Sequence, residues 1–280
     1  MDPLVAAAVL TAALLHATWH ALVKSSGDGV IALAGMNLVA GVVALALLPF
    51  VLVPTPAAAV VIAISVILHA GYKIALASLY ARADLSQGYP LARGMTPIFA
   101  AVLGFVFLKE VPAMATLAGV LAISGGVLAL AFDRRGSAIS APALIAAIVV
   151  AVTVAAYSAL DAYGIRMNGD WLGFTAWLVA CDSAAFIAYA FARRGIATLA
   201  VWRSGWLRTL TSGVLGVTAF GVFMWALSRA QVGAVTALRE TSVLFAALIG
   251  AFVLRETVTR ARAIAAVMVM GGAAAIPLFR

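Results

Sequence analysis

Long, nearly uninterrupted apolar runs fill this chain from end to end, and they restrict its fold more than any other feature. Hydrophobic residues make up 65% of the 280 residues and charged residues 10%, against roughly 45–50% and about 25% in an average soluble domain. Because a membrane-spanning helix needs about 20 apolar residues, the runs predict an all-α integral membrane protein. We expect ten spans, near residues 3–23, 30–50, 58–80, 87–108, 113–132, 142–163, 171–192, 207–228, 232–254 and 261–279.

The composition also excludes several classes of protein. Eighteen basic and ten acidic side chains cannot cover the surface of a soluble enzyme, and the apolar content excludes a disordered chain. The net charge of +8 comes mostly from residues between the apolar runs, where they meet lipid headgroups and not nucleic acid. The single cysteine, Cys181, rules out an internal disulfide. We expect no metal, no cofactor and no catalytic residue.

The chain repeats itself at an offset of 146 residues. Residues 99–110 (FAAVLGFVFLKE) align without gaps to residues 245–256 (FAALIGAFVLRE), and six of the aligned residues are identical. The same offset places Arg93 on Arg239. The sequence therefore predicts that one half of the chain is a copy of the other.

Each predicted half, residues 1–136 and residues 137–280, holds five of the expected spans. Five is an odd number, so the second half must lie upside down relative to the first within one membrane domain. Inverted repeats of this kind recur in secondary transporters, which bind their substrates near the midplane between the repeats.

The ends of the repeated segments carry a resemblance to a known family. Leu108-Lys109-Glu110 and Leu254-Arg255-Glu256 resemble the end of the fourth helix in each half of the ten-helix EamA-type carriers of the drug/metabolite transporter superfamily. Residues 16–24 (HATWHALVK) are similar to the first helix of one bacterial branch. The resemblance covers essentially the whole chain and implies a metabolite carrier that works by alternating access, without a substrate motif.

Basic and aromatic side chains gather in the spans of the first half. A charged side chain at membrane depth costs at least about 2.5–3.5 kcal/mol, so such residues are functional candidates. Lys73 and Arg93 lie at similar depths from one face, and the end of the first span approaches the same face. We expect the substrate to be bound by Trp19, His20, Lys73, Tyr89 and Arg93.

The second half supplies the intramembrane carboxylates, Asp161, Asp182 and Glu240. Arg239 and Glu240 are consecutive, so their side chains leave the helix about 100° apart. We expect Arg239 to pair with Asp161, which leaves Glu240 to bind a substrate amine or a proton. Asp161, Asp182 and Arg239 are the candidates for charge pairing or ion coupling. Cations on one wall and carboxylates on the other suit a zwitterion.

Structural roles would also explain these residues. The Arg239–Asp161 pair would neutralise itself without touching a substrate, because membrane charges usually pair. Lys73 and Arg93 would extend to the headgroups, and His20 would bridge two helices by a hydrogen bond.

We expect a secondary-active or facilitative transporter of small polar metabolites, chiefly amino acids, which it exports or exchanges across the bacterial cytoplasmic (inner) membrane. The sequence contains no ATP-binding loop, and protons are the candidate coupling ion. Two alternatives remain, a carrier of anionic organic phosphates or phosphonates and an intramembrane transferase. The expected partners are the substrate and the lipid bilayer, in a monomer or weak homodimer that binds no nucleic acid.

Overall fold

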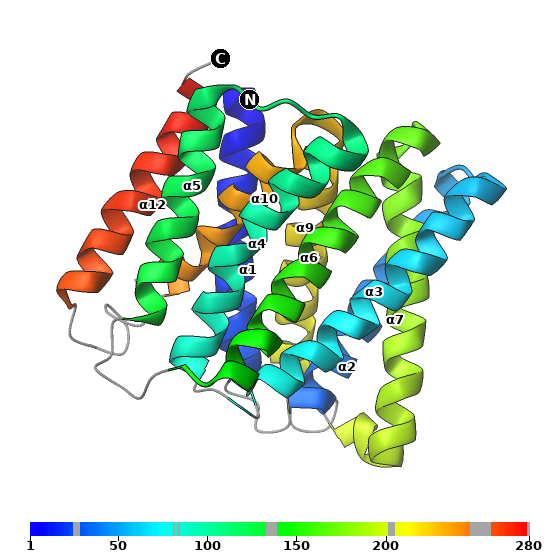
Figure 1. Ribbon diagram of the computed structural model, residues 1–280. Coiled ribbons are helices and arrows are strands. Elements are labelled where there is room, and N and C mark those ends of the chain that lie inside the picture. Colours follow the sequence, from blue (N-terminus) through cyan, green and yellow to red (C-terminus); the bar gives the residue numbers. More distant parts are fainter. Residues whose placement is uncertain are drawn as a thin grey trace.

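The computed structural model describes residues 1–24, 29–80, 82, 85–132, 139–200, 205–246 and 259–278. Within these ranges the chain forms helices joined by short connections, and no strand occurs. The helices lie side by side in one bundle (Figure 1). In chain order they are α1 (Pro3–Lys24), α2 (Gly29–Leu47), η1 (Leu48–Phe50), α3 (Pro56–Tyr80), α4 (Leu85–Leu108), α5 (Met114–Ala131), α6 (Ala141–Asn168), α7 (Trp171–Arg194), η2 (Gly195–Ala200), α9 (Trp206–Arg229), α10 (Val232–Glu240) and α12 (Arg260–Leu278).

In the described part of the chain, eight helices, α1 to α7 and α9, are long and apolar enough to cross a membrane. The last helix, α12, adds a shorter apolar stretch, Arg262–Pro277. These helices lie where the first eight spans and the last span were predicted. The expected boundary between the two halves, at residue 136, lies outside the described residues.

The span predicted over residues 232–254 is interrupted at Thr241 in its described part. Helix α10 ends after nine residues, and a short helical segment follows over residues 242–246. Thr241 makes the turn between them, because both its backbone N–H and its hydroxyl donate to the carbonyl of Leu238, at 3.2 and 2.6 Å. Residues 247–254 lie outside the described part of the chain.

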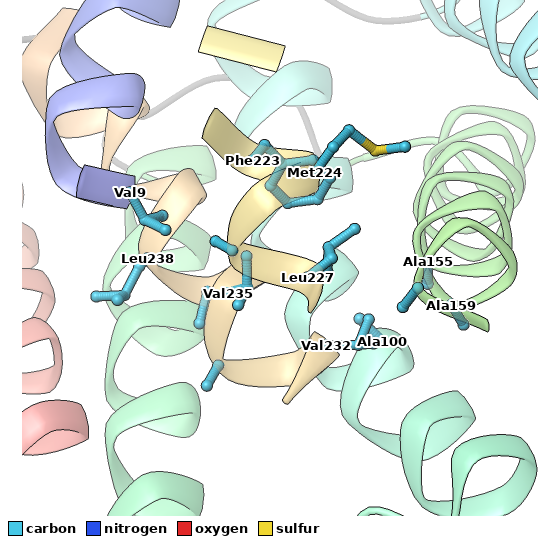
Figure 2. Close-up of a cluster of buried hydrophobic side chains, with 14 of the residues drawn as sticks. Val9, Ala100, Ala155, Ala159, Phe223, Met224, Leu227, Val232, Val235 and Leu238 are labelled. Atoms are coloured by element: carbon cyan, nitrogen blue, oxygen red, sulfur yellow. The ribbon is translucent and has the colours of Figure 1, made fainter. Parts of the chain in front are cut away.

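Helix α10 lies at the centre of the bundle, and all nine of its residues are buried. Figure 2 shows Val232, Val235 and Leu238 of this helix among side chains of four neighbouring helices. The labelled neighbours are Val9 of α1, Ala100 of α4, Ala155 and Ala159 of α6, and Phe223, Met224 and Leu227 of α9. Such all-round burial fits a helix that is enclosed by protein and not by lipid.

Glycines allow α5 and α12 to pack closely in antiparallel directions. A Cβ atom on Gly126 would lie 2.9 Å from the carbonyl oxygen of Ala265, and one on Gly272 would lie 2.6 Å from that of Gly119. Both distances are too short for a real side chain. Close backbone approach through small residues is a main source of helix association in lipid, where hydrophobic burial does not drive it.

The N-terminus and the end of α12 lie at the same end of the bundle (Figure 1), and the amino group of Met1 donates to the carbonyl of Ile276 at 3.5 Å. We call this end the terminal face. Helix α5 also begins there, because Gly119 in its second turn packs against Ile276 near the end of α12. The other end of the bundle is called the opposite face.

Candidate substrate site

A cavity of about 290 Å³ lies inside the bundle. Its wall is formed by α1, α2, α3, α6, α7 and α9, with one arginine each from α4 and α10, and it is mostly apolar. It lies mostly in the half of the bundle that ends at the opposite face, because its lining from α3 and, except for Ala12, its lining from α1 come from the second halves of these helices. Its ionisable and hydrogen-bonding lining residues are His16, Trp19, His20, Asn37, His69, Tyr72, Lys73, Arg93, Tyr157, Asp182, Ser183 and Arg239.

Six of the nine residues selected from the sequence line this cavity, namely Trp19, His20, Lys73, Arg93, Asp182 and Arg239. The other three, Tyr89, Asp161 and Glu240, lie behind the wall and touch a lining residue. The structure thus brings all nine together, but only part of the expected pairing occurs.

A three-residue cluster, which we call the midplane cluster, joins α4 to α10. Arg93 Nε lies 2.7 Å from Glu240 Oε2, and Arg239 Nε lies 3.8 Å from Glu240 Oε1. Tyr89 supports Arg93 from behind, with its ring centre 5.6 Å from the guanidinium carbon. Two guanidinium groups therefore share one carboxylate, and the cluster carries an excess positive charge at the cavity wall.

The expectation that Glu240 faces the cavity is wrong. Its side chain has no exposed surface, and it is engaged by Arg93. Arg239 instead reaches the cavity, with its guanidinium carbon 4.0 Å from the ring centre of Phe223. Among the described residues, Nε and Nη2 of both arginines and both oxygens of Glu240 make no hydrogen bond, so the contacts within the cluster are ion pairs without hydrogen-bond geometry. Buried donors of this kind are costly unless something accepts from them.

The helices that carry this cluster are both irregular beside it. Pro90 and Pro97 flank Arg93 in α4. A proline has no backbone N–H, so Pro97 leaves the carbonyl of Arg93 without its helical donor. Helix α10 ends at Glu240 itself. Interrupted helices at the midplane are typical of the ion and substrate sites of secondary transporters.

The predicted Arg239–Asp161 contact is absent from the ion pairs of the described residues. Asp161 instead accepts a hydrogen bond from Ser65 Oγ at 2.5 Å, and its other oxygen lies 3.5 Å from His69 Nε2. Both partners come from α3, which packs along α6. The prediction failed because it considered depth in the membrane but not which helices are neighbours.

Lys73 and Asp182 form a second pair across the cavity wall. Lys73 Nζ lies 3.0 and 3.1 Å from the two carboxylate oxygens, and 4.5 Å from the ring centre of Phe186. Lys73 thus points into the protein and does not extend to the headgroups.

Three aromatic side chains of α1 form a hydrogen-bonded chain at the cavity. Trp19 Nε1 donates to His16 Nδ1 at 3.3 Å, so the proton of a neutral His16 is on Nε2. That nitrogen lies 3.1 Å from His20 Nε2 and donates to it. The Trp19 and His20 rings also stack, with their centres 3.7 Å apart. This network positions polar rings along the cavity without adding charge.

A second charged cluster, which we call the terminal cluster, joins four helix ends. Glu110 Oε1 lies 2.7 Å from Arg166 Nη2, and Glu110 Oε2 accepts from the backbone N–H of Val232 at 2.9 Å. The Arg166 guanidinium donates to the carbonyls of Leu227 and Ala230 at the end of α9, at 2.9 to 3.3 Å. These contacts tie α4, α6, α9 and α10 together at the terminal face.

No group of three or more histidine, cysteine, aspartate or glutamate side chains within the described ranges could hold a metal ion. The sequence analysis did not select Ser65, which binds Asp161, or the polar lining residues Asn37, Tyr72 and Ser183, and it did not predict the contact between His69 and Asp161. A signal was present, because Ser65, His69 and Lys73 are spaced by four residues and so share one face of α3.

Residues 141–277 match the EamA-like transporter family. The second half of this chain is an EamA-like transporter domain. The chain is therefore a multi-pass membrane transporter of small molecules. No curated protein matches the chain. A solved structure described as "Crystal structure of protein" superposes on it with a TM-score of 0.81 over 100% of both chains at 21% identity, and at this identity the likeness shows the fold alone.

The EamA-like domain supplies the acidic partner of each ionic contact at the cavity. Lys73 meets Asp182, Arg93 meets Glu240 and His69 meets Asp161. In these three contacts the basic side chain comes from the first half of the chain and the carboxylate from the EamA-like domain, whereas Arg239 meets Glu240 within that domain. The site is therefore built between the two halves, and neither half could form it alone.

Proposed function

We propose that this protein is a secondary-active or facilitative transporter that exports or exchanges amino acids by alternating access. The observation that carries the proposal is a separation of charge around the cavity. Next to the cavity lie the midplane cluster, where two arginines share one carboxylate, and, behind the lining residue His69, Asp161, which has no arginine or lysine partner among the described residues. A ligand with both charges satisfies both at once.

The carboxylate of an amino acid fits the Arg239 and Arg93 side of the cavity. Both guanidiniums line the cavity and both retain buried donors without partners. A carboxylate that accepts from such donors forms charge-assisted hydrogen bonds, which are roughly twice as strong as neutral ones. Arg239 is the better candidate, because its own carboxylate contact is the longer, at 3.8 Å.

The amine fits the side of the cavity that holds His69 and Asp161. The Asp182 carboxylate is already neutralised by Lys73 at 3.0 Å, so the uncompensated negative charge is that of Asp161. The rings of Trp19, Tyr72 and Phe220 between these walls offer an apolar surface to the substrate side chain. A volume of about 290 Å³ is at the small end of ligand pockets, which suits a single amino acid.

Helix packing supports the proposal that two inverted repeats build this site. Helix α3 packs along α6 as α9 packs along α1, and α2 packs on α9 as α7 packs on α3. Helices at equivalent positions also pair with each other, as α2 with α7, α4 with α10 and α5 with α12. A two-fold axis in the membrane plane would produce this set of contacts.

The close contact between α5 and α12 has the same symmetry. At the offset of 146 residues, Gly126 corresponds to Gly272 and Gly119 to Ala265. Gly126 meets Ala265, and Gly272 meets Gly119, so one contact is the copy of the other. Reciprocal contacts of this kind are the mark of a two-fold interface.

The helix ends support ten crossings. The N-terminus and the end of α12 lie at the terminal face (Figure 1), which requires an even number of crossings. Helix α9 also ends there, because Ala230 binds Arg166 of the terminal cluster, whereas α12 begins at the opposite face. We propose that the chain crosses the membrane once more between the end of α9 and the start of α12.

Alternating access follows from where the contacts lie. The cavity belongs to the half of the bundle at the opposite face, and the terminal cluster ties four helices together at the other end. To expose the site at the terminal face, the two halves must rotate against each other and loosen the Glu110–Arg166 contact. The cavity lies within one chain, so a monomer or weak homodimer in a bacterial inner membrane would suffice.

A carrier of organic phosphates or phosphonates is the second candidate, because the midplane cluster has two guanidiniums for one carboxylate. Arginine pairs bind phosphate well. Asp161 and Asp182 on the other side of the cavity would, however, repel a dianion. The proposal for amino acids uses Asp161, and the proposal for phosphates leaves it unexplained.

Counterflow in proteoliposomes tests the proposed function. Vesicles loaded with one unlabelled compound should take up its labelled form faster than empty vesicles, for amino acids but not for organic phosphates or quaternary amines. Counterflow of an organic phosphate alone would replace the proposal with the second candidate. Absence of counterflow for all three classes would refute both.

A further inference from the structure

We propose that Asp161 and His69 form a proton-binding site in the cavity wall, and that the proton and the substrate amine compete for it, so that transport exchanges amino acid for proton. The inference rests on the proposed function and adds the coupling ion and its site.

Asp161 is positioned to hold a proton. Its side chain is fully buried, and it accepts a hydrogen bond from Ser65 Oγ on one oxygen. The other oxygen lies 3.5 Å from His69 Nε2. A carboxylate enclosed at membrane depth is costly to keep charged unless a cation lies close by.

The permanently charged basic side chains of the cavity lie next to carboxylates other than Asp161. Lys73 binds Asp182, Arg93 binds Glu240, and Arg239 lies beside Glu240 and Phe223. Within the described residues, the ion pairs give Asp161 only His69 as a basic partner. A neutral imidazole carries no charge, so the charge on Asp161 is compensated only when this pair takes up a proton.

His69 connects Asp161 to the cavity. His69 lines the cavity whereas Asp161 does not, and the imidazole ring is held by Tyr157 at 4.1 Å and Phe220 at 6.0 Å between ring centres. Imidazole has two nitrogens, so it can accept a proton from cavity water on one and donate from Nε2 to Asp161 Oδ2. The proton returns by the reverse path, and no other bond changes.

The remaining titratable and charged groups of the cavity do not provide an equivalent site. They are His16, His20, Tyr72, Lys73, Arg93, Tyr157, Asp182 and Arg239. His16 and His20 bind each other and Trp19, without a carboxylate among the contacts of the described residues. A proton on both would break their mutual hydrogen bond. Asp182 already has a permanent cation in Lys73.

Competition between proton and amine follows from the charge of the site. Lys73, Arg93 and Arg239 balance Asp161, Asp182 and Glu240 when His69 is neutral, so the empty site has no net charge. A proton bound by the Asp161–His69 pair gives the whole site a net positive charge, which repels a substrate amine. The amine, once bound, in turn disfavours the proton. Two ligands that exclude each other in this way are exchanged across the membrane.

Proton release on substrate binding tests the inference with purified protein. An amino acid that gives counterflow is added at saturation in weak buffer, to wild type, to Asp161→Asn and to Ser158→Ala. Ser158 is a matched control, because it is buried on α6 one turn before Asp161 and donates only to its own helix, at the carbonyl of Val154. Wild type and Ser158→Ala should release up to about one proton per substrate bound, and Asp161→Asn should bind more weakly and release none.

The wild-type protein provides a second measurement if Asp161→Asn does not fold. Its affinity for the amino acid should rise as the pH increases from 5.5 to 8, by at most about tenfold per pH unit. In proteoliposomes, a lumen more acidic than the outside should drive accumulation of the amino acid. Binding without proton release and without pH dependence would overturn the proton site and leave the proposed function standing. Release that persists unchanged in Asp161→Asn would place the proton elsewhere and also overturn it.

Discussion

The midplane cluster and the terminal cluster are both made of arginine and glutamate, yet they are built in opposite ways. In the terminal cluster one arginine meets one glutamate, and both also bind backbone groups at helix ends. In the midplane cluster two arginines share one fully buried glutamate, and four guanidinium nitrogens and both glutamate oxygens make no hydrogen bond among the described residues. Of the buried polar atoms that the structure describes in the terminal cluster, Glu110 Oε1 alone makes none, whereas the midplane cluster retains several donors for a further acceptor.

This difference separates a structural contact from a binding site with the same residue types. An ion pair whose polar atoms are used by the backbone stabilises a helix junction and has little left to offer a ligand. An ion cluster with an excess charge and unused donors beside a cavity costs free energy until an anion binds. Residue type and depth in the membrane do not distinguish a structural ion pair from a binding site, whereas the contacts of the side chains do.

The largest expected effect comes from removing the shared carboxylate of the midplane cluster. Glu240→Gln strands Arg93 and Arg239 without a counter-charge, and breaking a buried pair from one side typically costs about 3–5 kcal/mol. We expect a large drop in the thermal unfolding midpoint in detergent and loss of transport. An unfolding midpoint equal to that of wild type would show that the cluster does not depend on Glu240.

The next effect separates binding from stability. Arg239→Gln removes the excess charge and leaves the Arg93–Glu240 pair neutral, so the protein should unfold near the wild-type midpoint. Loss of a charge-assisted hydrogen bond to the substrate is worth about 1.5–3 kcal/mol, which corresponds to a rise in KM for counterflow of about 10-fold to 100-fold. An unchanged KM would remove Arg239 from the substrate site.

Arg166→Gln is the matched substitution in the terminal cluster, and it should have the opposite profile. Arg166 binds two carbonyls and Glu110, but about a third of its side chain is exposed, so we expect a loss of only about 1–2 kcal/mol of stability. The KM for counterflow should stay at the wild-type value. If KM rises as far as in Arg239→Gln, the two clusters do not differ in the way that the contacts indicate.

The smallest effect concerns the neutral network on α1. Trp19→Phe keeps a ring next to His20 but removes the N–H that donates to His16. A neutral hydrogen bond contributes about 0.5–1.5 kcal/mol, so the KM should rise by less than about tenfold and the unfolding midpoint should change little. A complete loss of counterflow, with the protein still folded, would assign Trp19 a larger part in binding than any charged residue.

The sequence predicted the helical membrane fold, and most of its spans, because each apolar run is itself a local signal. It also selected nine residues that the structure brings together, since charge at membrane depth is rare. It did not predict their pairing, because pairing depends on which helices are neighbours. The Arg239–Asp161 contact was inferred from equal depth, whereas α3 and not α10 supplies the partners of Asp161.

The apolar pattern of the sequence also did not predict that helix α10 ends after Glu240. Residues 232–254 form one apolar run, and the turn at Thr241 arises from hydrogen bonds of a single threonine to Leu238. Threonine donates to carbonyls in regular membrane helices as well, so its presence does not indicate a turn. The burial of Glu240 against Arg93 likewise follows from the contact between α10 and α4, which no local pattern encodes.

The central claim is that the cavity recognises both charges of a zwitterion, and a competition experiment on wild-type protein tests it most directly. The amino acid with the fastest counterflow is compared with its deaminated and its decarboxylated analogue as inhibitors of its own uptake at pH 7.5. If the cavity binds both charges, each analogue should inhibit about 10-fold or more weakly than the amino acid, because each lacks one of the two charged groups that the site binds. Inhibition by either analogue at the same concentration as the amino acid would contradict the claim.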